Sequence, residues 1–515
     1  MGWTDPRQIA ATSAALARWG PTLAAVYAAA ATRHGRRVAL VDDRGSLTYA
    51  ELDRRSSELA GGLRSSGFRA GDQLGLLCHN HIEFVEASIA AAKAGLVAVY
   101  LNTGFAAPQL GDVAAREGLA AIVVDEELLD VVDASGFDGD TIVTTADSVG
   151  RHPGFSELRS GPGPRVLLPS RPTAPVLLTS GTTGTPKGAR RAGRPAGLTS
   201  AVGVLERIPY RSGDVSVIPT PLFHAWGLAQ LTIVAATAST AVLVRRFDVD
   251  ATLDAIETHH ASVLAVVPAM IQRLLAADRL DGCDLSSLRI VAASGSALPA
   301  AVADEWMERV GENLYNLYGS TEVGQATLAT PTDLRAAPGT AGLPIAGVTL
   351  EIVDDHGDPV PSGATGRIMV GNDAQFTEYT GGGTKERVRG LMASGDVGYL
   401  DHDGRLFVTG RADDMIVSGG ENVYPLEVED VILSHPDAAD AMVVGVPDGD
   451  FGQRLAAFVV RRPGSELDDV EVRSLVGSRL ARYKVPRDVT FVDAVPRNAT
   501  GKLLRRAAPP SSGRT

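Results

Sequence analysis

The sequence predicts an α/β protein in which a large N-terminal domain of helix-covered mixed and parallel sheets precedes a small, mobile α+β domain. Over the first four hundred residues, short apolar strands alternate with amphipathic helices, which is typical of parallel sheets covered by helices. Beyond that point, short strands separated by turns replace the alternation. The chain of 515 residues is long enough for two or three domains.

The N-terminal alternation can be followed element by element. Residues 38–42 (VALVD) form the first expected strand, and Thr48 with Glu51 makes a capping box that starts a helix with leucines on one side. We expect further strands at 73–78, 96–101, 120–124, 175–179, 215–219, 262–267, 288–293 and 314–318, and a helix at 81–95. Ligands of such folds bind at the carboxyl ends of the strands, so the loops there are candidate sites.

The change of pattern places a domain boundary at 410–413, giving an N-terminal domain over 1–410 and a C-terminal domain over 411–515. The C-terminal domain has the length of a compact domain. Within it, we expect helices at 426–436 and 469–482 and strands at 441–447, 455–460 and 489–492.

Charge and cysteine content exclude several classes of protein. The formal net charge of −13 argues against a nucleic-acid partner, which would require a basic face. Cys78 and Cys283 form neither a CxxC motif nor a metal-binding spacing, which favours a reduced, cytoplasmic protein. The apolar stretch 231–244 is too short to cross a bilayer, so we expect buried core there and no integral membrane segment.

Residues 179–188 (TSGTTGTPKG) combine hydroxyls, glycines and Lys187 directly after an expected strand. Glycines let backbone amides turn inward and the lysine adds a positive charge, so the segment suits a polyphosphate. The alternative is a surface turn. The GxxxxGK[ST] motif of P-loop kinases and ATPases is absent. Lysine is rare, at positions 93, 187, 385, 484 and 502 only, and where arginine is the usual cation a lysine can mark a need for a compact ammonium.

Other motifs carry a chemical interpretation and a structural alternative. In YGSTE (318–322), Tyr318 offers a flat face for a base and Glu322 an oxygen for Mg²⁺, but the segment could equally cap a helix. Asp396, in SGD, could accept ribose hydroxyls or only form a turn. Lys502 could be catalytic or solvated, and His224 could be a satisfied core residue.

Taken together and in this order, the motifs resemble the adenylate-forming superfamily of acyl-CoA synthetases, adenylation domains and luciferases. The resemblance rests on LLTSGTTGTPKG, SGSALP, NLYGSTE, SGDVGYLDHDGRLFVTGRADDMIVSGGENVYPLEVE and PRNATGK, and covers almost the whole chain. Within this superfamily, the sequence looks most like bacterial fatty-acid and related carboxylate–CoA ligases. The resemblance implies ATP, Mg²⁺ and coenzyme A as cofactors and a small-molecule carboxylic acid as substrate.

The resemblance also assigns roles to residues. ATP phosphates would be held by the loop residues Thr179, Ser180, Gly181, Thr182, Thr183, Gly184 and Lys187, and the adenine by Ser294, Gly295, Ser296, Ala297, Tyr318, Gly319 and Ser320. Thr321 would contact the α-phosphate, Glu322 and Thr182 would hold Mg²⁺, and Asp396 and Arg411 would bind the ribose. Lys502 would bridge the carboxylate and the α-phosphate, and His224 would gate the acyl pocket. Asp413 would be a hinge, and Gly419, Gly420 and Glu421 would face the active site after the C-terminal domain rotates, with Gly420 lining the pantetheine tunnel.

The final acceptor and the acid are less determined. The implied reaction forms acyl-AMP and then acyl-CoA, with transfer to a carrier-protein thiol or an amine as the alternative, and no motif excludes a luciferase-type oxygenase. The sequence around His224 contains no Asp that could hold an α-ammonium group, which argues against an amino-acid substrate. The segments 221–231 and 264–270 are mainly apolar, without Arg or Lys, which favours a fatty, aryl or polycyclic acid. Segment 375–390 departs from the family pattern, and both a monomer and a homodimer stay open.

Overall fold

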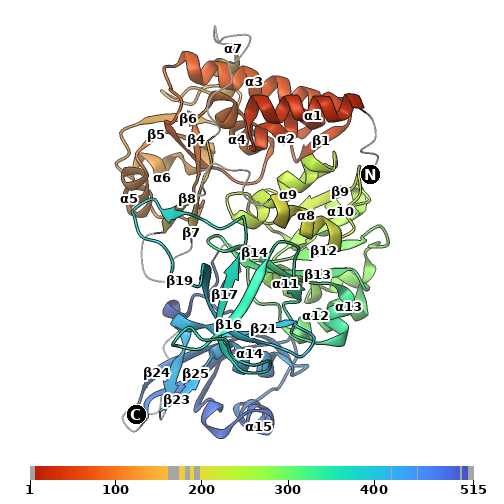
Figure 1. Cartoon of the computed structure of the whole chain (residues 1–515), viewed down its shortest axis with the longest axis vertical. Coiled ribbons are helices and arrows are strands. Elements are labelled where there is room, and N and C mark those ends of the chain that lie inside the picture. Colours follow the sequence, from red (N-terminus) through yellow and green to blue (C-terminus); the bar gives the residue numbers. More distant parts are fainter. Residues whose placement is uncertain are drawn as a thin grey trace.

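The computed structural model describes residues 6–160, 173–179, 186–190, 198–418, 420–448, 451–498 and 501–508. These ranges form four β-sheets with their helices, and the N-terminal segments lie at the top of Figure 1 and the C-terminal segments at the bottom. The predicted α/β fold class is confirmed. No helix in the described ranges is long and apolar enough to cross a membrane.

The first sheet has seven strands in the order β18-β8-β7-β4-β3-β5-β6. They are β3 (Gln73–Leu77), β4 (Val97–Tyr100), β5 (Leu119–Val124), β6 (Asp140–Val143), β7 (Val176–Thr179), β8 (Lys187–Arg190) and β18 (Glu378–Tyr379). β3 to β7 are parallel, whereas β8 and β18 run antiparallel to their neighbours. The helices between these elements are α3 (Tyr49–Ser65), α4 (Ile82–Ala94), α5 (Ala107–Glu117), α6 (Leu129–Asp133) and α7 (Phe155–Ser160).

The second sheet has nine strands in the order β15-β14-β13-β12-β11-β9-β10-β1-β2, and its centre is parallel. They are β1 (Val38–Asp42), β2 (Gly45–Thr48), β9 (Val215–Ile218), β10 (Thr240–Leu243), β11 (Val263–Val266), β12 (Ile290–Ala293), β13 (Leu314–Ser320), β14 (Gly324–Ala329) and β15 (Leu343–Pro344). The accompanying helices are α1 (Pro6–Trp19), α2 (Leu23–His34), α8 (Leu198–Arg207), α9 (Ala225–Ala236), α10 (Val249–Thr258), α11 (Pro268–Leu275), α12 (Ala300–Arg309) and α13 (Pro331–Ala336).

The first two sheets share a hydrophobic core, and the buried Asn80 joins them at its edge. The Asn80 amide nitrogen donates to the carbonyl of Thr220 (2.8 Å), and its oxygen accepts from the Leu222 amide (2.9 Å). Asn80 follows β3, whereas Thr220 and Leu222 follow β9, so the hydrogen bonds link the strand ends of the two sheets. The apolar stretch predicted to be core is mostly buried, with Thr232 and Ala236 exposed, and it includes the second half of α9 and β10.

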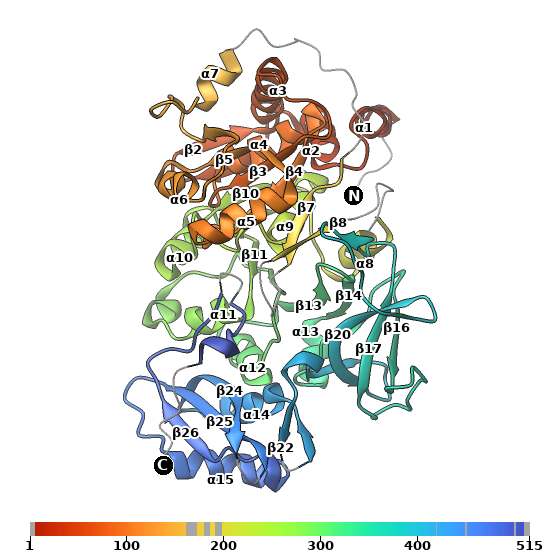
Figure 2. The same cartoon turned by 90° about the vertical axis from the view of Figure 1, so that its left-hand side faces the viewer.

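The third sheet is antiparallel and consists of β16 (Thr349–Val353), β17 (Gly366–Gly371), β19 (Arg387–Val388), β20 (Leu391–Leu400) and β21 (Leu406–Arg411). It lies beside the β13–β14 end of the second sheet (Figure 2). Its last strand leads through the 3₁₀ turn η3 (Ala412–Asp414) into the C-terminal unit.

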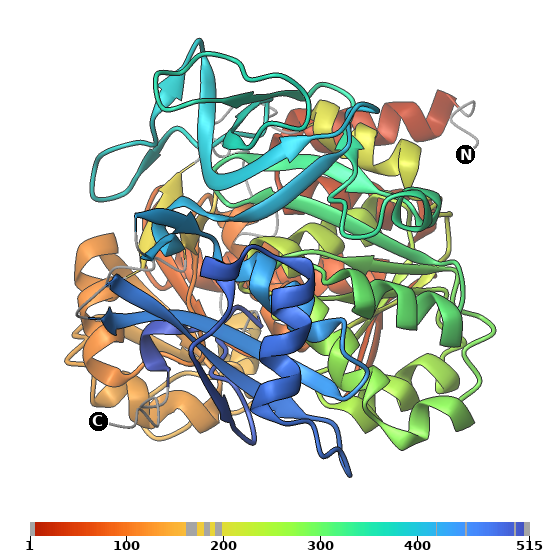
Figure 3. The same cartoon turned by 90° about the horizontal axis from the view of Figure 1, so that it is seen from below.

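The fourth sheet, which forms the C-terminal unit, consists of β22 (Ile416–Ser418), β23 (Glu421–Val423), β24 (Ala438–Asp448), β25 (Gly452–Arg461) and β26 (Asp488–Phe491). It carries α14 (Pro425–Leu433) and α15 (Asp469–Arg479) and has its own hydrophobic core. Seen from below, this unit lies across the rest of the molecule (Figure 3). The remaining 3₁₀ turns are η1 (Glu126–Leu128), η2 (Asp278–Gly282), η4 (Arg482–Lys484) and η5 (Arg505–Ala507).

Local sequence signals explain where several elements begin and end. The predicted capping box is present, since the Thr48 side chain accepts from the Glu51 amide and the Glu51 carboxylate accepts from the Thr48 amide. Helix α4 ends at Gly95, whose φ of 75° is a left-handed conformation that glycine adopts without strain. The expected N-terminal strands differ from the observed ones by two residues at most.

Candidate active site

The predicted site residues gather at the carboxyl ends of the parallel strands of the second sheet. Ser294 to Ala297 follow β12, and Tyr318 to Ser320 form the end of β13. The Ser294 hydroxyl donates to the Leu317 carbonyl (2.8 Å), which ties the two strand ends together. Gly295 has a φ of 95°, and a Cβ on it would lie 3.3 Å from Val267, which follows β11. Three adjacent strand ends therefore form one continuous surface.

The alternative in which YGSTE caps a helix is wrong. Tyr318 to Ser320 lie on β13 and pair antiparallel with β14, so Glu322 lies in the turn between two strands. The Ser320 hydroxyl accepts from the Glu322 amide (3.3 Å) and the Val323 amide (3.2 Å), which fixes this turn. Its oxygen also lies 3.1 Å from one Glu322 carboxylate oxygen, to which the hydroxyl donates. The turn thereby holds the Glu322 carboxylate close to the strand ends.

Asp396 connects the second and third sheets at the site. Its carboxylate accepts from the Tyr318 hydroxyl (Oδ2, 2.7 Å) and from Nη1 of Arg411 (Oδ1, 3.1 Å). Burial raises the pKa of Tyr318 well above its ordinary value, and Asp396 adds to the shift, so the phenol stays neutral and donates. Arg411 stands opposite Asp396 in the β20–β21 register and also donates to Asp413 (3.3 Å). Both Asp396 oxygens thus have a partner, and ribose hydroxyls would need their second lone pairs.

The C-terminal unit brings Lys502 to the same place. Gly501 fits so closely against the end of β11 that a Cβ on it would lie 2.9 Å from Ala269 and 3.1 Å from Val267. Arg497 connects this loop to the fourth sheet, since it donates to the Gly501 carbonyl (2.6 Å) and to Asp440 on β24 (2.7 Å). The Lys502 loop therefore lies directly over the strand ends.

The electrostatic environment of Lys502 is that of the site itself. Burial lowers the pKa of Lys502 and Arg411 lowers it further, while Asp396 and Glu322 raise it. Among the described residues, its ammonium has no hydrogen-bond or ion-pair partner. A buried cation without a partner favours the arrival of an anion.

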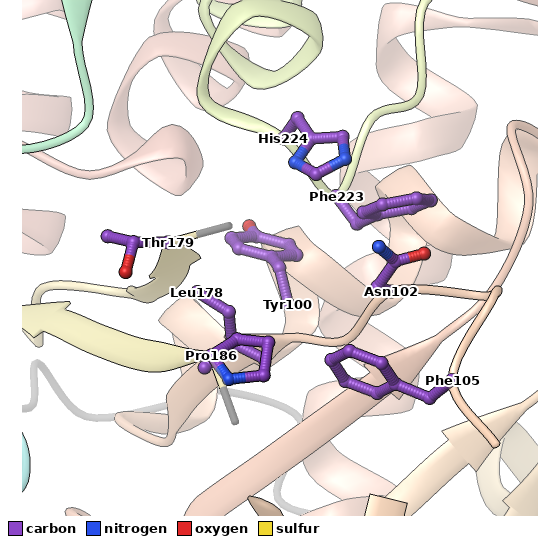
Figure 4. A pocket seen from close by; sticks show the side chains of 8 residues that line it. All are labelled: Tyr100, Asn102, Phe105, Leu178, Thr179, Pro186, Phe223 and His224. Atoms are coloured by element: carbon purple, nitrogen blue, oxygen red, sulfur yellow. The ribbon is translucent and has the colours of Figure 1, made fainter. Parts of the chain in front are cut away.

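His224 lines a cavity beside the start of the phosphate-loop segment. The cavity holds about 250 Å³ of space, part of it open to solvent. Figure 4 shows the side chains around it, which come from the ends of β4 and β7 and the residues after β4, from the residue before β8, and from the turn before α9. They are Tyr100, Asn102, Phe105, Leu178, Thr179, Pro186, Phe223 and His224. Burial lowers the pKa of His224 to about 4, so its ring is neutral at physiological pH. Nε2 of His224 has no partner among the described residues, which contradicts the alternative of a satisfied core histidine.

The two apolar segments predicted to form the acyl pocket are neighbours in the structure. Trp226, on α9, donates from its indole nitrogen to the Val266 carbonyl at the end of β11 (3.0 Å). Trp226, Val266, Val267 and Met270 belong to one buried cluster. The wall next to His224 is therefore apolar and well packed.

The structure describes only part of the predicted phosphate loop. Ser180, Gly181, Thr182, Thr183 and Gly184 lie outside the described residues, as does Gly419. The two arms are present, since Thr179 on β7 stands opposite Lys187 on β8 and its hydroxyl donates to the Lys187 carbonyl (3.1 Å).

Gly420 and Glu421 are not brought to the strand ends. Both are exposed in the β22–β23 hairpin at the lower end of the molecule (Figure 1), and a Cβ on Gly420 would meet nothing within 4 Å. In this arrangement the C-terminal unit presents Lys502 to the site and points the hairpin away from it.

Two residues near the site were not predicted. The Tyr379 hydroxyl donates to Glu322 (3.1 Å), and the Lys385 ammonium donates to the Ser394 carbonyl (2.5 Å), one residue before Gly395. Both lie in segment 375–390. Two features of the sequence could have pointed to these residues: the departure of this segment from the family pattern and the rarity of lysine.

Comparison with known proteins agrees with this geometry. Residues 27–380 match the model of the AMP-binding enzyme family, and residues 427–502 match that of its C-terminal domain. The chain is 33% identical over 472 residues to a fatty acid–[acyl-carrier-protein] ligase of Streptomyces coeruleorubidus, covering 90% of this chain and 91% of the relative. It is 34% identical over 484 residues to a feruloyl-CoA synthase of an Amycolatopsis species, covering 93% and 94%.

A solved structure of similar shape is that of an anthranilate CoA ligase in complex with anthranoyl-AMP. The TM-score is 0.86 at 25% identity, covering 94% of this chain and 96% of that one. The sequence matches extend over nearly the whole chain, and the fold agrees with them. The chain therefore belongs to the AMP-binding enzyme family.

Proposed function

We propose that the protein is an AMP-forming acid–thiol ligase, which activates a hydrophobic carboxylic acid with ATP and transfers the acyl group to coenzyme A. The observation that carries the proposal is the position of Lys502: Gly501 beside it fits against the end of β11, and the charges of Asp396, Arg411 and Glu322 act on its ammonium. A cation that has no partner among the described residues and lies near groups suited to a nucleotide is what a reaction between two anions requires.

The first half-reaction joins a carboxylate to the α-phosphorus of ATP and releases pyrophosphate. The Asp396–Arg411 pair would take the ribose hydroxyls, and Tyr318 would face the base with its hydroxyl held by Asp396. Lys502 would draw the substrate carboxylate and the α-phosphate together, and Lys187 would bind the phosphates that leave. Positioning and charge stabilisation supply most of the catalysis in phosphoryl chemistry, so fixed cations are the essential groups.

The site also fits a magnesium ion. Glu322 provides a carboxylate whose oxygens each accept one hydrogen bond, from Ser320 and Tyr379, and each oxygen keeps a lone pair. Glu322 and Thr182, the latter outside the described residues, would hold the ion. When bound, Mg²⁺ neutralises charge on the phosphates.

The second half-reaction requires a different arrangement of the C-terminal unit. CoA thiol would attack the acyl-adenylate after a rotation about Asp413, in the turn between β21 and β22, that withdraws Lys502 and brings Gly420 to the site. The exposure of Gly420 and the empty space around it support a surface that is used in another orientation. The two domains of the proposed enzyme would meet at 410–411.

The substrate is a hydrophobic acid, and an aryl acid is the favoured class. The apolar wall formed by Trp226 and Val267 and the neutral His224 present no cation for a second carboxylate. Two relatives are a feruloyl-CoA synthase and an indoleacetate–CoA ligase, and both names contain an aryl acyl group. Because ATP and CoA are cytoplasmic metabolites and both cysteines are free, we place the enzyme in the cytoplasm.

One relative favours a second candidate acceptor. The fatty acid–[acyl-carrier-protein] ligase matches over 90% of the chain, so transfer to a carrier-protein phosphopantetheine thiol is the alternative. Coenzyme A and the carrier protein both offer a phosphopantetheine thiol, so the two acceptors differ only outside the reacting atoms.

The test is a two-step assay on the purified protein with Mg²⁺. Pyrophosphate release is measured with aryl, short-chain, medium-chain, long-chain and polycyclic acids, and then thioester formation is measured with CoA, a loaded carrier protein or an amine. We expect acid-dependent pyrophosphate release with aryl acids and a thioester with CoA. The proposal fails if ATP stays intact with every acid supplied. A thioester on the carrier protein alone would establish the second candidate.

A further inference from the structure

A linker between β17 and β19 of the third sheet contains β18 and reaches back to the first sheet. Strand β18 pairs antiparallel with β8, with Tyr379 opposite Ala189. The Thr380 amide donates to the Gly188 carbonyl (2.8 Å). In Figure 2 this segment lies beside β8, which is the second arm of the phosphate-loop segment and begins at Lys187. The linker thus contacts the part of the site that binds phosphate in the proposed function.

The packing around β18 leaves little freedom. A Cβ on Gly188 would lie 2.8 Å from the Thr380 hydroxyl oxygen and 2.6 Å from Val176, so the two strands approach as closely as glycine allows. The Thr380 hydroxyl donates to the buried Glu117 at 2.8 Å. The backbone of Tyr379 is therefore fixed relative to that of Lys187.

The Tyr379 side chain contacts two groups of opposite charge that come from different sheets. Its hydroxyl donates to Oε1 of Glu322 at 3.1 Å, and Nζ of Lys187 lies 5.6 Å from the centre of its ring. Phe376 packs against the ring at a centroid distance of 4.7 Å, and the Phe376 amide donates to the Glu322 carbonyl (2.8 Å). One aromatic residue thus spans the gap between the phosphate lysine and the proposed metal carboxylate.

We infer that Tyr379 is a positioning residue of the nucleotide site. Its hydroxyl orients the Glu322 carboxylate and its ring restricts the position of the Lys187 ammonium, so that the distance between these two charged groups is maintained. The inference rests on the proposed function. Lys187 is exposed on a strand, and a long side chain there has many rotamers, of which a ring contact selects a few. Glu322 has two hydrogen-bond donors, Ser320 and Tyr379, one on each oxygen, which orients the carboxylate plane.

The two halves of the side chain can be removed separately. Tyr379→Phe keeps the ring and removes the hydroxyl, whereas Tyr379→Leu removes both. Tyr399→Phe is the matched control, since Tyr399 is a half-buried tyrosine on β20 whose ring stacks on Phe407. Each variant is measured by calorimetric binding of ATP with and without Mg²⁺ and without acid, by the KM for ATP and kcat of pyrophosphate release, and by thermal unfolding.

For Tyr379→Phe, we expect about tenfold weaker ATP binding in the presence of Mg²⁺, the scale for loss of a group that orients a metal ligand, and unchanged binding without Mg²⁺. Tyr379→Leu should additionally weaken binding without Mg²⁺, because Lys187 is no longer held. Tyr399→Phe should match the wild type in both conditions.

The inference is overturned if Tyr379→Phe binds ATP like the wild type under both conditions. It is overturned equally if the variant loses the same factor with and without Mg²⁺, or loses affinity only in proportion to a lowered unfolding temperature, since either result indicates a packing role. The proposed function is judged separately: a wild type that binds ATP but releases no pyrophosphate with any acid would refute the ligase and leave the binding comparison intact.

Discussion

Arg462 of the C-terminal unit forms an ion pair with Glu305 on helix α12, with Nη2 of the arginine 2.6 Å from Oε2 of the glutamate. The pair joins the end of β25 to helix α12, which accompanies the second sheet. Together with the close fit of Gly501 on the end of β11, it holds the C-terminal unit in the orientation that presents Lys502.

Breaking that pair should slow the first half-reaction selectively. In Glu305→Gln, we expect acyl-AMP formation to fall about two- to fivefold, which corresponds to the ~0.5–1 kcal/mol of a partly exposed ion pair. Thioester formation from supplied acyl-adenylate should be unchanged or faster, because it does not use this orientation. Added salt should shrink the effect on the first step.

The control for this prediction is Glu312→Gln. Glu312 pairs with Arg335 on α13, so its ion pair lies outside the C-terminal unit. An equal slowing of both half-reactions in Glu305→Gln, or the same slowing in Glu312→Gln, would contradict a role for the Glu305–Arg462 pair in orientation.

Lys502 should be required for adenylation only. We expect Lys502→Ala to lower acyl-AMP formation by about 10²–10³-fold, the scale for removal of one electrostatic donor from a transition state. Thioester formation from supplied acyl-adenylate should persist. Lys484→Ala serves as the control, because Lys484 pairs with Glu427 inside the C-terminal unit (2.5 Å). Pyrophosphate release at the wild-type rate in Lys502→Ala would remove this lysine from the mechanism.

Substitution of Gly420 should impair the second half-reaction and spare the first. A side chain at Gly420 meets open space in the present arrangement, so Gly420→Leu should leave pyrophosphate release near the wild-type rate. The side chain would obstruct the thiol after rotation, and CoA thioester formation should be lost. A φ of 86° at this position strains any side chain by ~1–3 kcal/mol.

Gly464→Leu controls for that strain. Gly464 lies in another exposed turn of the C-terminal unit, with a φ of 78° and nothing within 4 Å of a Cβ. Gly464→Leu should carry out both half-reactions. If both steps fall by the same factor in Gly420→Leu, the assignment of this glycine to the thiol path is wrong.

His224 should make the stability of the protein depend on pH. Burial lowers the pKa of His224 to about 4, from an ordinary value of 6.5, so the unfolded chain binds a proton between these pH values that the folded protein does not. The free energy of unfolding therefore falls as the pH is lowered from 6.5 to 4. In His224→Phe this contribution is absent, and the variant should gain stability relative to the wild type over that range.

The measurement is denaturant unfolding of both proteins at several pH values between 7.5 and 4.5. His402→Phe is the control, because His402 is exposed to water in a surface turn. Parallel pH profiles for the wild type and His224→Phe would show that the His224 imidazole is protonated in the folded protein as readily as in the unfolded one.

The sequence predicted the fold class and the strands well because both depend on local patterns. Short apolar runs at regular spacing gave the strands of the parallel sheets, and the Thr48–Glu51 capping box gave the start of α3. The grouping of Ser294 with Tyr318 follows from the carboxyl ends of adjacent parallel strands, which lie at one edge of the sheet. Asp396 and Arg411 instead face each other as a cross-strand pair of the antiparallel strands β20 and β21.

Contacts between distant segments could not be predicted. Tyr379 reaches Lys187 only because β18 pairs with β8, and the register of two-residue strands is set by tertiary packing around Gly188. The turn at Glu322 was ambiguous for a similar reason: Ser320 favours both a helix cap and a strand turn, and the pairing of β13 with β14 decides between them.

The five lysines of the chain differ in how open they are to reagents. The Lys93 ammonium is enclosed by Asp53, Ser56 and Ser57, the Lys385 and Lys484 ammonium groups each donate a hydrogen bond, and Lys502 is half-buried. Among the lysines, all of which the structure describes, only Lys187 is exposed. Among the lysines, an acylating probe for primary amines would consequently modify chiefly Lys187, and protection of that side chain from the probe would report nucleotide binding.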